Sequence, residues 1–490
     1  MTKSEKYIKL GRAVLADECK NSFYTFVKTF WDVINAEAFK DNWHIGFLCE
    51  ELQELSDCII NRTPKPYDLI INISPGTTKS TIVTIMFHPW LWSIDPTIRV
   101  ITNSYSSDLS IEHSTKSKDI VISDKYSELF PDVEIRRDKS GKQHYENTLS
   151  GFRFATSTGS SVTGYHAHVI INDDPQNPKQ AGSELLRLQS IEHLKTLSSR
   201  KVEKENTPTI TIMQRLHELD VTGHLLSLNS ENIRHICLPA KLSPKVKPTS
   251  VRSKYINGFM DPVRLSESVL KEALIELGSL DYSGQYDQDP IVAGGYIVKE
   301  DWFGEVSVSD FEYLYQKNNK PPIYFFVDTA YTEKQENDPT GIIAAVELEN
   351  NLYIKSGIKV KKEFPDLVKF LPQWVLSNGY DWRSSIRIEP KASGLSVIQQ
   401  LKRQTKLNVT ETKTPTDSKE TRLRSNSSIV ESGRVYLVDG SWNEEFISEV
   451  CGFPSKAHDE YVDLLNYAID YFINDKTKPI NKQQLLDDFR

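Results

Sequence analysis

Residues 67–87 of the chain read YDLIINISPGTTKSTIVTIMF. The run starts as a buried strand, passes through a turn containing Pro75, and continues as a helix that begins near Lys79. In such a unit, backbone N–H groups and the positive end of the helix dipole face an anion. The Lys79 amine is then placed to reach the β and γ phosphates of a nucleotide, and the Ser80 hydroxyl to ligate magnesium. The residues expected to form this ATP pocket are Ser74, Gly76, Thr77, Thr78, Lys79, Ser80 and Thr81.

Two later segments supply what a magnesium-bound nucleotide needs. The segment HAHVIINDDPQ (166–176) is a strand that ends in two carboxylates. Asp173 is the expected magnesium partner and Asp174 the candidate general base. The strand in TPTITIMQRLHELDVTGHLL (207–226) delivers Gln214 and Arg215 at its end, where polar side chains can sense the γ phosphate. An ordinary strand-ending turn is the alternative for each segment.

The second half of the chain places carboxylates at the ends of apolar strands and at the start of a helix. Asp328 ends the strand in 321–348, Glu389 ends the strand in 386–394, and the stretch KAHDEYVDLLNYAID starts a late helix. Carboxylates so placed suit two magnesium ions about 4 Å apart, which clamp the oxygens of a phosphodiester. The expected ligands are Asp328, Glu389, Asp459 and Asp463, with Glu460 and Asp338 as weaker candidates.

Basic residues near these carboxylates suit a phosphate groove. Lys391 adjoins Glu389, and residues 402–424 are rich in lysine and arginine. Both are expected to face a nucleic-acid backbone, with a solvated surface as the alternative.

Composition narrows the class of protein. The chain has 490 residues, 38% of them hydrophobic, and a net charge of -8, so two or three soluble globular domains are expected. No apolar run reaches the ~18 residues of a membrane span, and no signal peptide is visible, so a cytoplasmic protein without a membrane partner is expected. Because the chain is acidic, any DNA contact must be regional. The five scattered cysteines predict reduced, mostly buried thiols.

The alternation of short apolar strands with helical stretches predicts an α/β fold in two parts. The first five strands are expected at 67–73, 98–103, 151–156, 167–172 and 208–213. The second set is expected near 323–328, 341–348, 352–360, 386–388 and 434–438, with helices near 366–377, 394–404, 443–451 and 460–473. The expected divisions are a helical lead-in at 1–65, a first α/β domain at 66–240, a linker or connector at 241–320, a second α/β domain at 321–475 and a tail at 476–490.

Taken together, these residues resemble the large terminase subunit of tailed bacteriophages. The resemblance covers nearly the whole chain. It rests on Trp43-His44, ISPGTTKST, GSSVTG (159–164), IINDDP, IMQRLHELDVTGHLL, SGQYDQDP (283–290), VDTA, IEPKASG and HDEYVD in this order.

The resemblance implies an N-terminal P-loop-type ATPase of the ASCE class and a C-terminal nuclease of the RNase H-like (RuvC-like) fold. The implied activity is ATP-driven translocation of double-stranded viral DNA into procapsids, with cleavage of concatemeric DNA by the nuclease. The implied cofactors are ATP and Mg²⁺, with Mn²⁺ as an alternative in the nuclease site. The implied partners are the portal protein, the small terminase subunit and further copies in a ring on the portal; a monomer in solution stays open. The implied location is the cytoplasm of the infected bacterium, not the mature virion.

Two departures from the family pattern matter. Thr78 stands where family members commonly carry glycine, and Tyr165 stands where they often carry arginine. The arginine finger is therefore unassigned between Arg153 and Arg215. The alternatives to a terminase are a helicase-nuclease or resolvase of DNA repair, and a structural adaptor of a phage shell with a degenerate nucleotide pocket.

Overall fold

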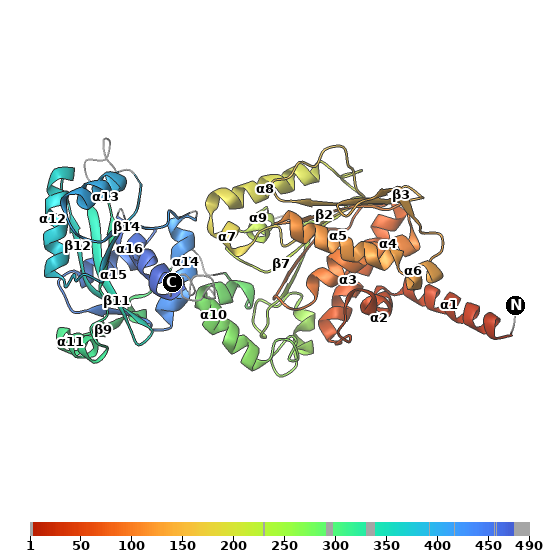
Figure 1. Ribbon diagram of the computed structural model, residues 1–490. Helices are drawn as coiled ribbons and strands as arrows, with labels where there is room; N and C mark the ends of the chain where they lie inside the picture. Colours follow the sequence, from red (N-terminus) through yellow and green to blue (C-terminus); the bar gives the residue numbers. More distant parts are fainter. Residues whose placement is uncertain are drawn as a thin grey trace. The chain divides into compact units, whose positions relative to one another are not determined.

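The computed structural model describes residues 3–228, 231–290, 297–329, 339–391, 393–415, 417–454, 456 and 458–474. Asp338 and the expected tail lie outside these residues. The chain forms two compact units, one of residues 1–274 and 280–292 and one of residues 275–279 and 293–490. The connector expected at 241–320 is thus divided between the two units, and each unit is described by itself below (Figure 1).

The first unit is built on an eight-stranded sheet in the order β3-β4-β5-β2-β6-β7-β1-β8. Its strands are β1 (Asp68–Ile73), β2 (Arg99–Ser104), β3 (Ile135–Ser140), β4 (His144–Asn147), β5 (Phe152–Ser157), β6 (Val169–Asp173), β7 (Thr209–Met213) and β8 (Ile233–Leu238). All neighbours from β5 to β8 in this order pair in parallel, and only β4 runs antiparallel to its neighbours, β3 and β5. The expected mainly parallel sheet is confirmed. Strand β7 lies between β1 and β6, so one strand separates the strand before the phosphate loop from the strand that ends at Asp173.

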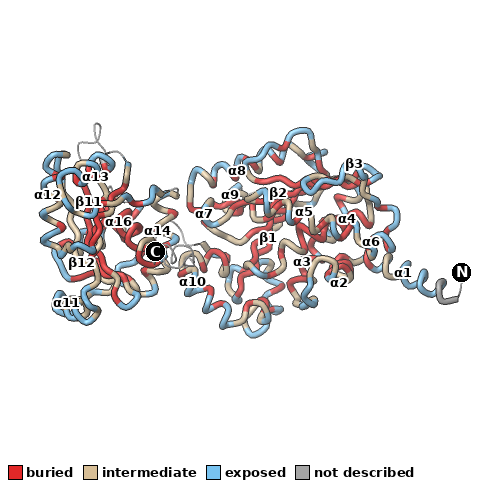
Figure 2. The backbone as a smooth tube through the Cα atoms, viewed as in Figure 1, coloured by how far each residue is buried: buried red, intermediate tan, exposed pale blue. Residues whose placement is uncertain are grey.

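Helices surround this sheet. They are α1 (Lys3–Asn21), α2 (Phe23–Ile34), α3 (Trp43–Asn61), η1 (Thr81–Met86), α4 (Phe87–Ile94), α5 (Ser107–Ile122), α6 (Asp124–Leu129), α7 (Pro178–Gly182), α8 (Glu184–Ser198), α9 (Val221–Ser227), η2 (Thr249–Lys254) and α10 (Glu267–Gln285, with 275–279 in the second unit). The aromatic stripe of α2 is fully enclosed, because Phe23, Phe26 and Phe30 are each 0% exposed. Figure 2 shows the strands as the buried layer of the unit.

The second unit is built on a seven-stranded mixed sheet in the order β14-β13-β10-β11-β12-β15-β9. Its strands are β9 (Gly304–Val306), β10 (Tyr324–Asp328), β11 (Thr340–Leu348), β12 (Asn351–Val360), β13 (Ser385–Ile388), β14 (Val409–Glu411) and β15 (Val435–Val438). Strand β11 runs antiparallel to both its neighbours, whereas β13 and β14 run parallel to β10.

The helices of the second unit are η3 (Glu300–Trp302), α11 (Val308–Lys317), α12 (Phe364–Ser377), α13 (Ser393–Gln404), α14 (Lys419–Glu431), α15 (Asn443–Gly452), α16 (Glu460–Ile469) and η4 (Asp470–Asn474). Helix α16 packs against β10, β11 and α14. Gly341 of β11 permits this close approach, because a Cβ atom there would lie 3.0 Å from Glu460 Cβ and 2.9 Å from Leu464 Cδ1.

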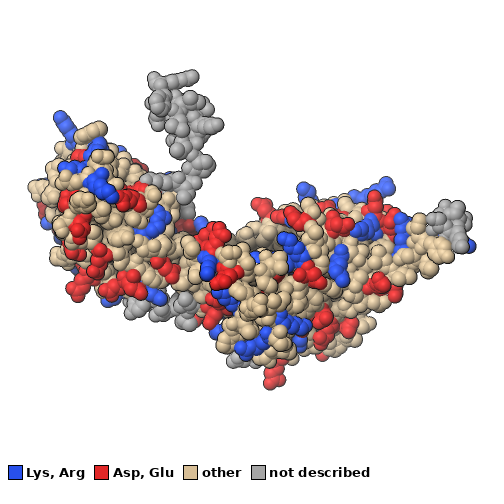
Figure 3. Space-filling view, turned by 90° about the horizontal axis from the view of Figure 1, so that it is seen from below, with Lys and Arg blue, Asp and Glu red and all other residues tan. Residues whose placement is uncertain are grey.

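All five cysteines are free and buried, as expected. Across the described residues, no helix is long and apolar enough to cross a membrane. On the face drawn in Figure 3, lysine and arginine side chains lie interspersed with aspartate and glutamate.

The core of the second unit supplies a stability prediction. Phe325 is 0% exposed in the cluster that fills one face of the sheet, so Phe325→Ala leaves a cavity and should lower the free energy of unfolding by about 3–5 kcal/mol. Trp382, which is 87% exposed, is the matched control, and Trp382→Ala should change stability by less than about 0.5 kcal/mol. Urea unfolding followed by circular dichroism measures both; equal effects would contradict the assigned core.

Candidate functional sites

The expected nucleotide pocket lies where parallel strands of the first unit end at one edge of the sheet. Strand β1 leads into the phosphate loop, β7 leads to Gln214, and β6 ends at Asp173. The register pairs Asp173 with Ile212 of β7, and Asn72 of β1 with Met213 of β7. Parallel pairing therefore brings these three sequence motifs together, as a ligand crevice at strand ends requires.

Two polar contacts join the phosphate loop to the acidic pair. Lys79 Nζ donates to Asp174 Oδ1 at 2.9 Å, and Ser80 Oγ donates to Asp173 Oδ1 at 3.0 Å. Burial raises the pKa of both Asp173 and Asp174, and the Lys79 ammonium opposes that rise. The backbone N–H of Gln214 also donates to Asp174. Lysine, hydroxyl and two carboxylates thus converge, and these donors fit a magnesium-bound phosphate.

A buried histidine of the lead-in helices contacts the backbone of the phosphate loop. His44 is fully buried, and its Nε2 lies 3.1 Å from the carbonyl oxygen of Thr77. Thr77 Oγ1 in turn donates to the Ser74 carbonyl, and Ser74 Oγ donates to the carbonyl of Tyr286. Asn42 Nδ2 lies 2.6 Å from His44 Nδ1. His44 therefore ties the loop to the lead-in helices.

His113 is a neighbour of the site that sequence reasoning missed. Its Nδ1 lies 3.3 Å from Asp173 Oδ2, and its side chain is almost fully buried. Burial, together with the Arg153 charge, lowers the pKa of His113 to about 4, so the imidazole is neutral near pH 7. His113 sits on a polar helix with no motif around it, so only the packing of α5 reveals the contact.

Neither arginine considered for the finger is free. Arg153 is 0% exposed, and its Nη1 donates to the carbonyl of Thr84. Arg215 donates from Nε to both oxygens of Asp220, and from Nη2 to the carbonyls of His217 and Glu218. Arg215 thereby braces the turn before α9, and a phosphate contact from it would require these bonds to break. The assignment of Arg215 to the ATP site stays a prediction.

Thr78 adopts the backbone conformation for which glycine is suited. Its φ is 61°, in the left-handed region, and the neighbouring Gly76 has a φ of 74°. A β-branched residue there is strained by about 1–2 kcal/mol. The side chain gains one local hydrogen bond, from Thr78 Oγ1 to the Thr77 carbonyl at 2.6 Å. Thr78 therefore holds a conformation that glycine would adopt at lower cost.

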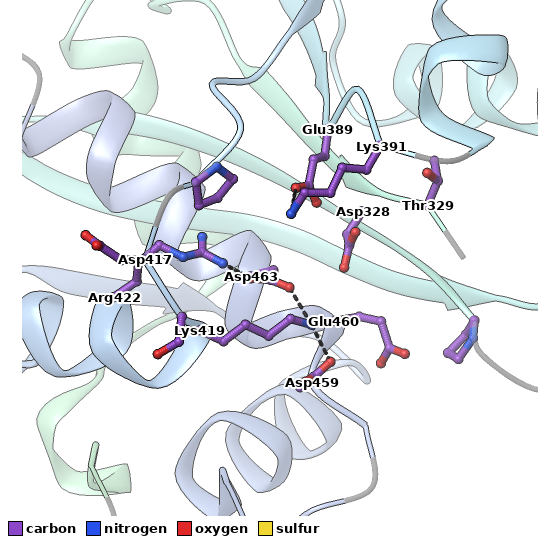
Figure 4. Close-up of a pocket in the computed structure, with 13 residues that line it drawn as sticks. Asp328, Thr329, Glu389, Lys391, Asp417, Lys419, Arg422, Asp459, Glu460 and Asp463 are labelled. Carbon is purple, nitrogen blue, oxygen red and sulfur yellow. Dashed lines mark hydrogen bonds and ion pairs between the residues drawn. The ribbon is translucent and has the colours of Figure 1, made fainter. Parts of the chain in front are cut away.

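The second candidate site lies at the edge of the other sheet. Strands β10 and β13 pair in parallel with Val327 opposite Ile388, so Asp328 and Glu389 end neighbouring strands side by side. Asp459 and Asp463 come from the start of α16, which packs on β10 and β11. The four carboxylates line one cavity of about 380 Å³ (Figure 4). The expected grouping of these residues is thus what the structure shows, and Glu460 lines the same cavity.

Basic side chains occupy the same cavity. Lys419 Nζ lies 2.6 Å from Asp459 Oδ1 and 2.6 Å from Asp463 Oδ2, and Arg422 Nη2 donates to Asp463 Oδ1. On the other side, Lys391 Nζ lies 2.8 Å from Glu389 Oε1. Figure 4 shows Lys419 reaching toward Asp459 and Asp463, and Lys391 turned toward Glu389. The basic stretch expected to face a nucleic-acid backbone therefore places Lys419 and Arg422 against the carboxylates themselves.

The donors fit hard divalent cations, because all four expected ligands offer carboxylate oxygens. Burial, followed by the charges of Asp463, Glu389 and Glu460, raises the pKa of Asp328 to about 8, although Lys419 lowers it. A divalent cation would relieve this crowding of negative charge. Within the described residues, no three His, Cys, Asp or Glu side chains are grouped closely enough to hold one metal ion. Glu389, Asp459 and Asp463 are instead paired with lysine or arginine.

The strain at Thr78 generates a prediction. Thr78→Gly removes the left-handed penalty, offset in part by the ~0.5–1 kcal/mol that glycine loses in chain entropy, and should stabilise the first unit by about 1 kcal/mol. Gly76→Ala places a Cβ at a φ of 74° and should destabilise it by a similar amount. Urea denaturation of both variants tests the pair, and destabilisation by Thr78→Gly would refute the strain.

The raised pKa of Asp328 predicts a pH effect. An unfolded aspartate titrates near ~3.9. Between that value and about 8, folded Asp328 holds a proton that the unfolded chain has lost, so stability falls as the pH rises. Asp328→Asn should therefore show a smaller loss of unfolding free energy between about pH 5 and about pH 8 than the parent chain. An identical loss in both proteins would show that Asp328 titrates normally.

Part of the second unit is similar in sequence to a known protein family. Residues 379–472 match a family model described as the terminase RNaseH-like domain. None of the curated proteins matches the sequence.

Among solved structures, the large terminase of a thermophilic bacteriophage is similar at 11% identity and a TM-score of 0.47, covering 83% of this chain and 94% of that one. The HK97 bacteriophage large terminase is similar at 10% identity and a TM-score of 0.37, covering 88% and 92%. The nuclease domain of the bacteriophage SPP1 large terminase, with bound Mn, is similar at 13% identity and a TM-score of 0.27, covering 36% and 98%.

The family match includes β13, with Glu389 beyond its end, and the helices that carry Lys419, Asp459 and Asp463. Over residues 379–472 the chain is therefore similar to the terminase RNaseH-like domain.

Proposed function

We propose that the chain is the large terminase subunit of a tailed bacteriophage, an ATP-driven motor for double-stranded DNA joined to a metal-dependent endonuclease. The observation that carries this proposal is the carboxylate pocket of Asp328, Glu389, Asp459 and Asp463 in a domain of the terminase family. The polar convergence of Lys79, Ser80, Asp173 and Asp174 in the first unit supports the motor activity.

In the nuclease site, Asp328 and Glu389 would hold one divalent cation, and Asp459 and Asp463 a second. Such ions supply stabilisation of charge on the scissile phosphate and activation of the attacking water. The chain's own part is to fix the carboxylates: β10 and β13 set the spacing of Asp328 and Glu389, and α16 supplies the other two. Lys391, which is 58% exposed, is available to contact the DNA backbone.

In the ATPase site, Lys79 and Ser80 would contact the phosphates and their magnesium, and Asp173 would hold the metal's water shell. Lys79 is now paired with Asp174, so an incoming phosphate must compete for its amine. Once released, Asp174 is an acceptor beside the backbone N–H of Gln214, where it can take a proton from water. The procapsid portal, the small terminase subunit and further copies of the chain are the proposed partners, and the host cytoplasm is the proposed location.

The proposal predicts two separable activities. Lys79→Ala should lower DNA-stimulated ATP turnover by about 10²-fold or more, because it removes a charge that stabilises the transferred phosphoryl group. Asp328→Asn should abolish nicking of supercoiled plasmid in Mn²⁺ or Mg²⁺. Each variant should keep the activity of the other site, and is therefore the folding control for its counterpart.

Other outcomes identify other functions. Parallel loss of both activities in a folded variant would contradict two independent sites. Absence of ATP turnover with DNA present would favour the structural adaptor, and displacement of a strand from a partial duplex would favour a helicase-nuclease of DNA repair.

A further inference from the structure

The carboxylates of the nuclease pocket are neutralised unevenly. On the α16 side, Asp459 Oδ1 and both oxygens of Asp463 contact Lys419 or Arg422. On the strand side, Glu389 pairs with Lys391, whose side chain is 58% exposed. The exposed Lys391 ammonium can move into water, so the strand side is the part of the pocket where a divalent cation displaces a lysine more readily.

Lys419 stands at a position that its own helix disfavours. Ser418 caps α14, so Lys419 is the first helical residue and lies at the positive end of the helix dipole. Lys419 Nζ nevertheless lies 2.6 Å from Asp459 Oδ1 and 2.6 Å from Asp463 Oδ2. The ammonium is therefore held by the carboxylates across the pocket and not by local preference.

Arg422 and Lys419 make different contacts with the two aspartates. It lies one turn after Lys419 on α14, and Asp463 lies one turn after Asp459 on α16. Lys419 bridges the two aspartates, whereas Arg422 contacts only Asp463, which is 4% exposed. Arg422 thus neutralises the buried aspartate, and the charge of Lys419, which is 37% exposed, is the one that can move into solvent.

We propose that Lys419 occupies the place of the second divalent cation, so that the nuclease pocket binds its two cations in order. The first binds between Asp328 and Glu389, and the second binds at Asp459 and Asp463 only after Lys419 has left. Backbone phosphate of the DNA substrate is the anion that can accept the released ammonium. Lys419 is thereby a positioning residue that couples substrate binding to completion of the metal site. This inference rests on the proposed nuclease function.

The test is a titration of the full chain with Mn²⁺, without DNA, followed by calorimetry and by the electron paramagnetic resonance signal of free Mn²⁺. The parent chain should bind one ion clearly more tightly than a second. Lys419→Gln should tighten the second ion by about tenfold or more, and Lys419→Arg, which keeps the charge, should not. Lys391→Gln is the matched control: it removes an exposed ion pair beside the first position and should leave the second affinity unchanged.

A second arm adds a short duplex with phosphorothioate linkages. The duplex should tighten the second Mn²⁺ of the parent chain and have little further effect in Lys419→Gln, because no ammonium remains to be displaced. Two equal affinities in the parent chain, or an unchanged second affinity in a folded Lys419→Gln variant, would overturn the role of Lys419. If the parent chain and Lys419→Gln both bind no Mn²⁺, the nuclease proposal itself is wrong.

Discussion

Parallel strand pairing is the constraint on which both sites depend. A parallel neighbour ends at the same edge of the sheet, so residues that follow each strand meet in space although they are far apart in sequence. Register decides which of them meet: Val327 opposite Ile388 sets Asp328 beside Glu389. In the other unit, β7 lies between β1 and β6 and carries the segment before Gln214 to the same edge as Asp173. A slip of one residue in either sheet would turn these side chains to the opposite face.

The apolar strands were predictable because alternation and β-branched runs mark them directly. The ten expected strands are all present, with bounds that differ by one or two residues. Strands β3, β4, β8, β9 and β14 were missed. Strands β9 and β14 have three residues each, β3 and β4 are mainly polar, and β8 has the polar pair Arg234 and His235 near its start. Helix α14 was missed because its sequence, KETRLRSNSSIVE, has no apolar stripe. One side of α14 is buried because α14 packs against α16, and the local pattern of apolar residues does not predict this contact.

The acidic residues of the candidate sites could be predicted from the sequence, whereas the contacts of the basic residues were harder to predict. Aspartates that end strands stand out against apolar neighbours, so Asp173, Asp328 and Glu389 could be named in advance. Arg215 and Arg153 also looked available, but guanidinium groups reach several acceptors, and here they are held by a local turn and by a helix carbonyl. His44 and His113 show the converse: their importance depends on contacts with the phosphate loop and with Asp173.

The buried cysteines have a practical consequence. Burial raises the pKa of the Cys49, Cys58, Cys237 and Cys451 thiols, and that of Cys19 is raised likewise. Thiolate is the form that reacts with maleimides and related reagents, so the native thiols are slow targets. A single cysteine introduced on an exposed helix therefore reacts first, and the natural sequence serves as the background for attaching fluorophores or spin labels. Distances within either unit then become measurable between two such probes, without removal of any native thiol.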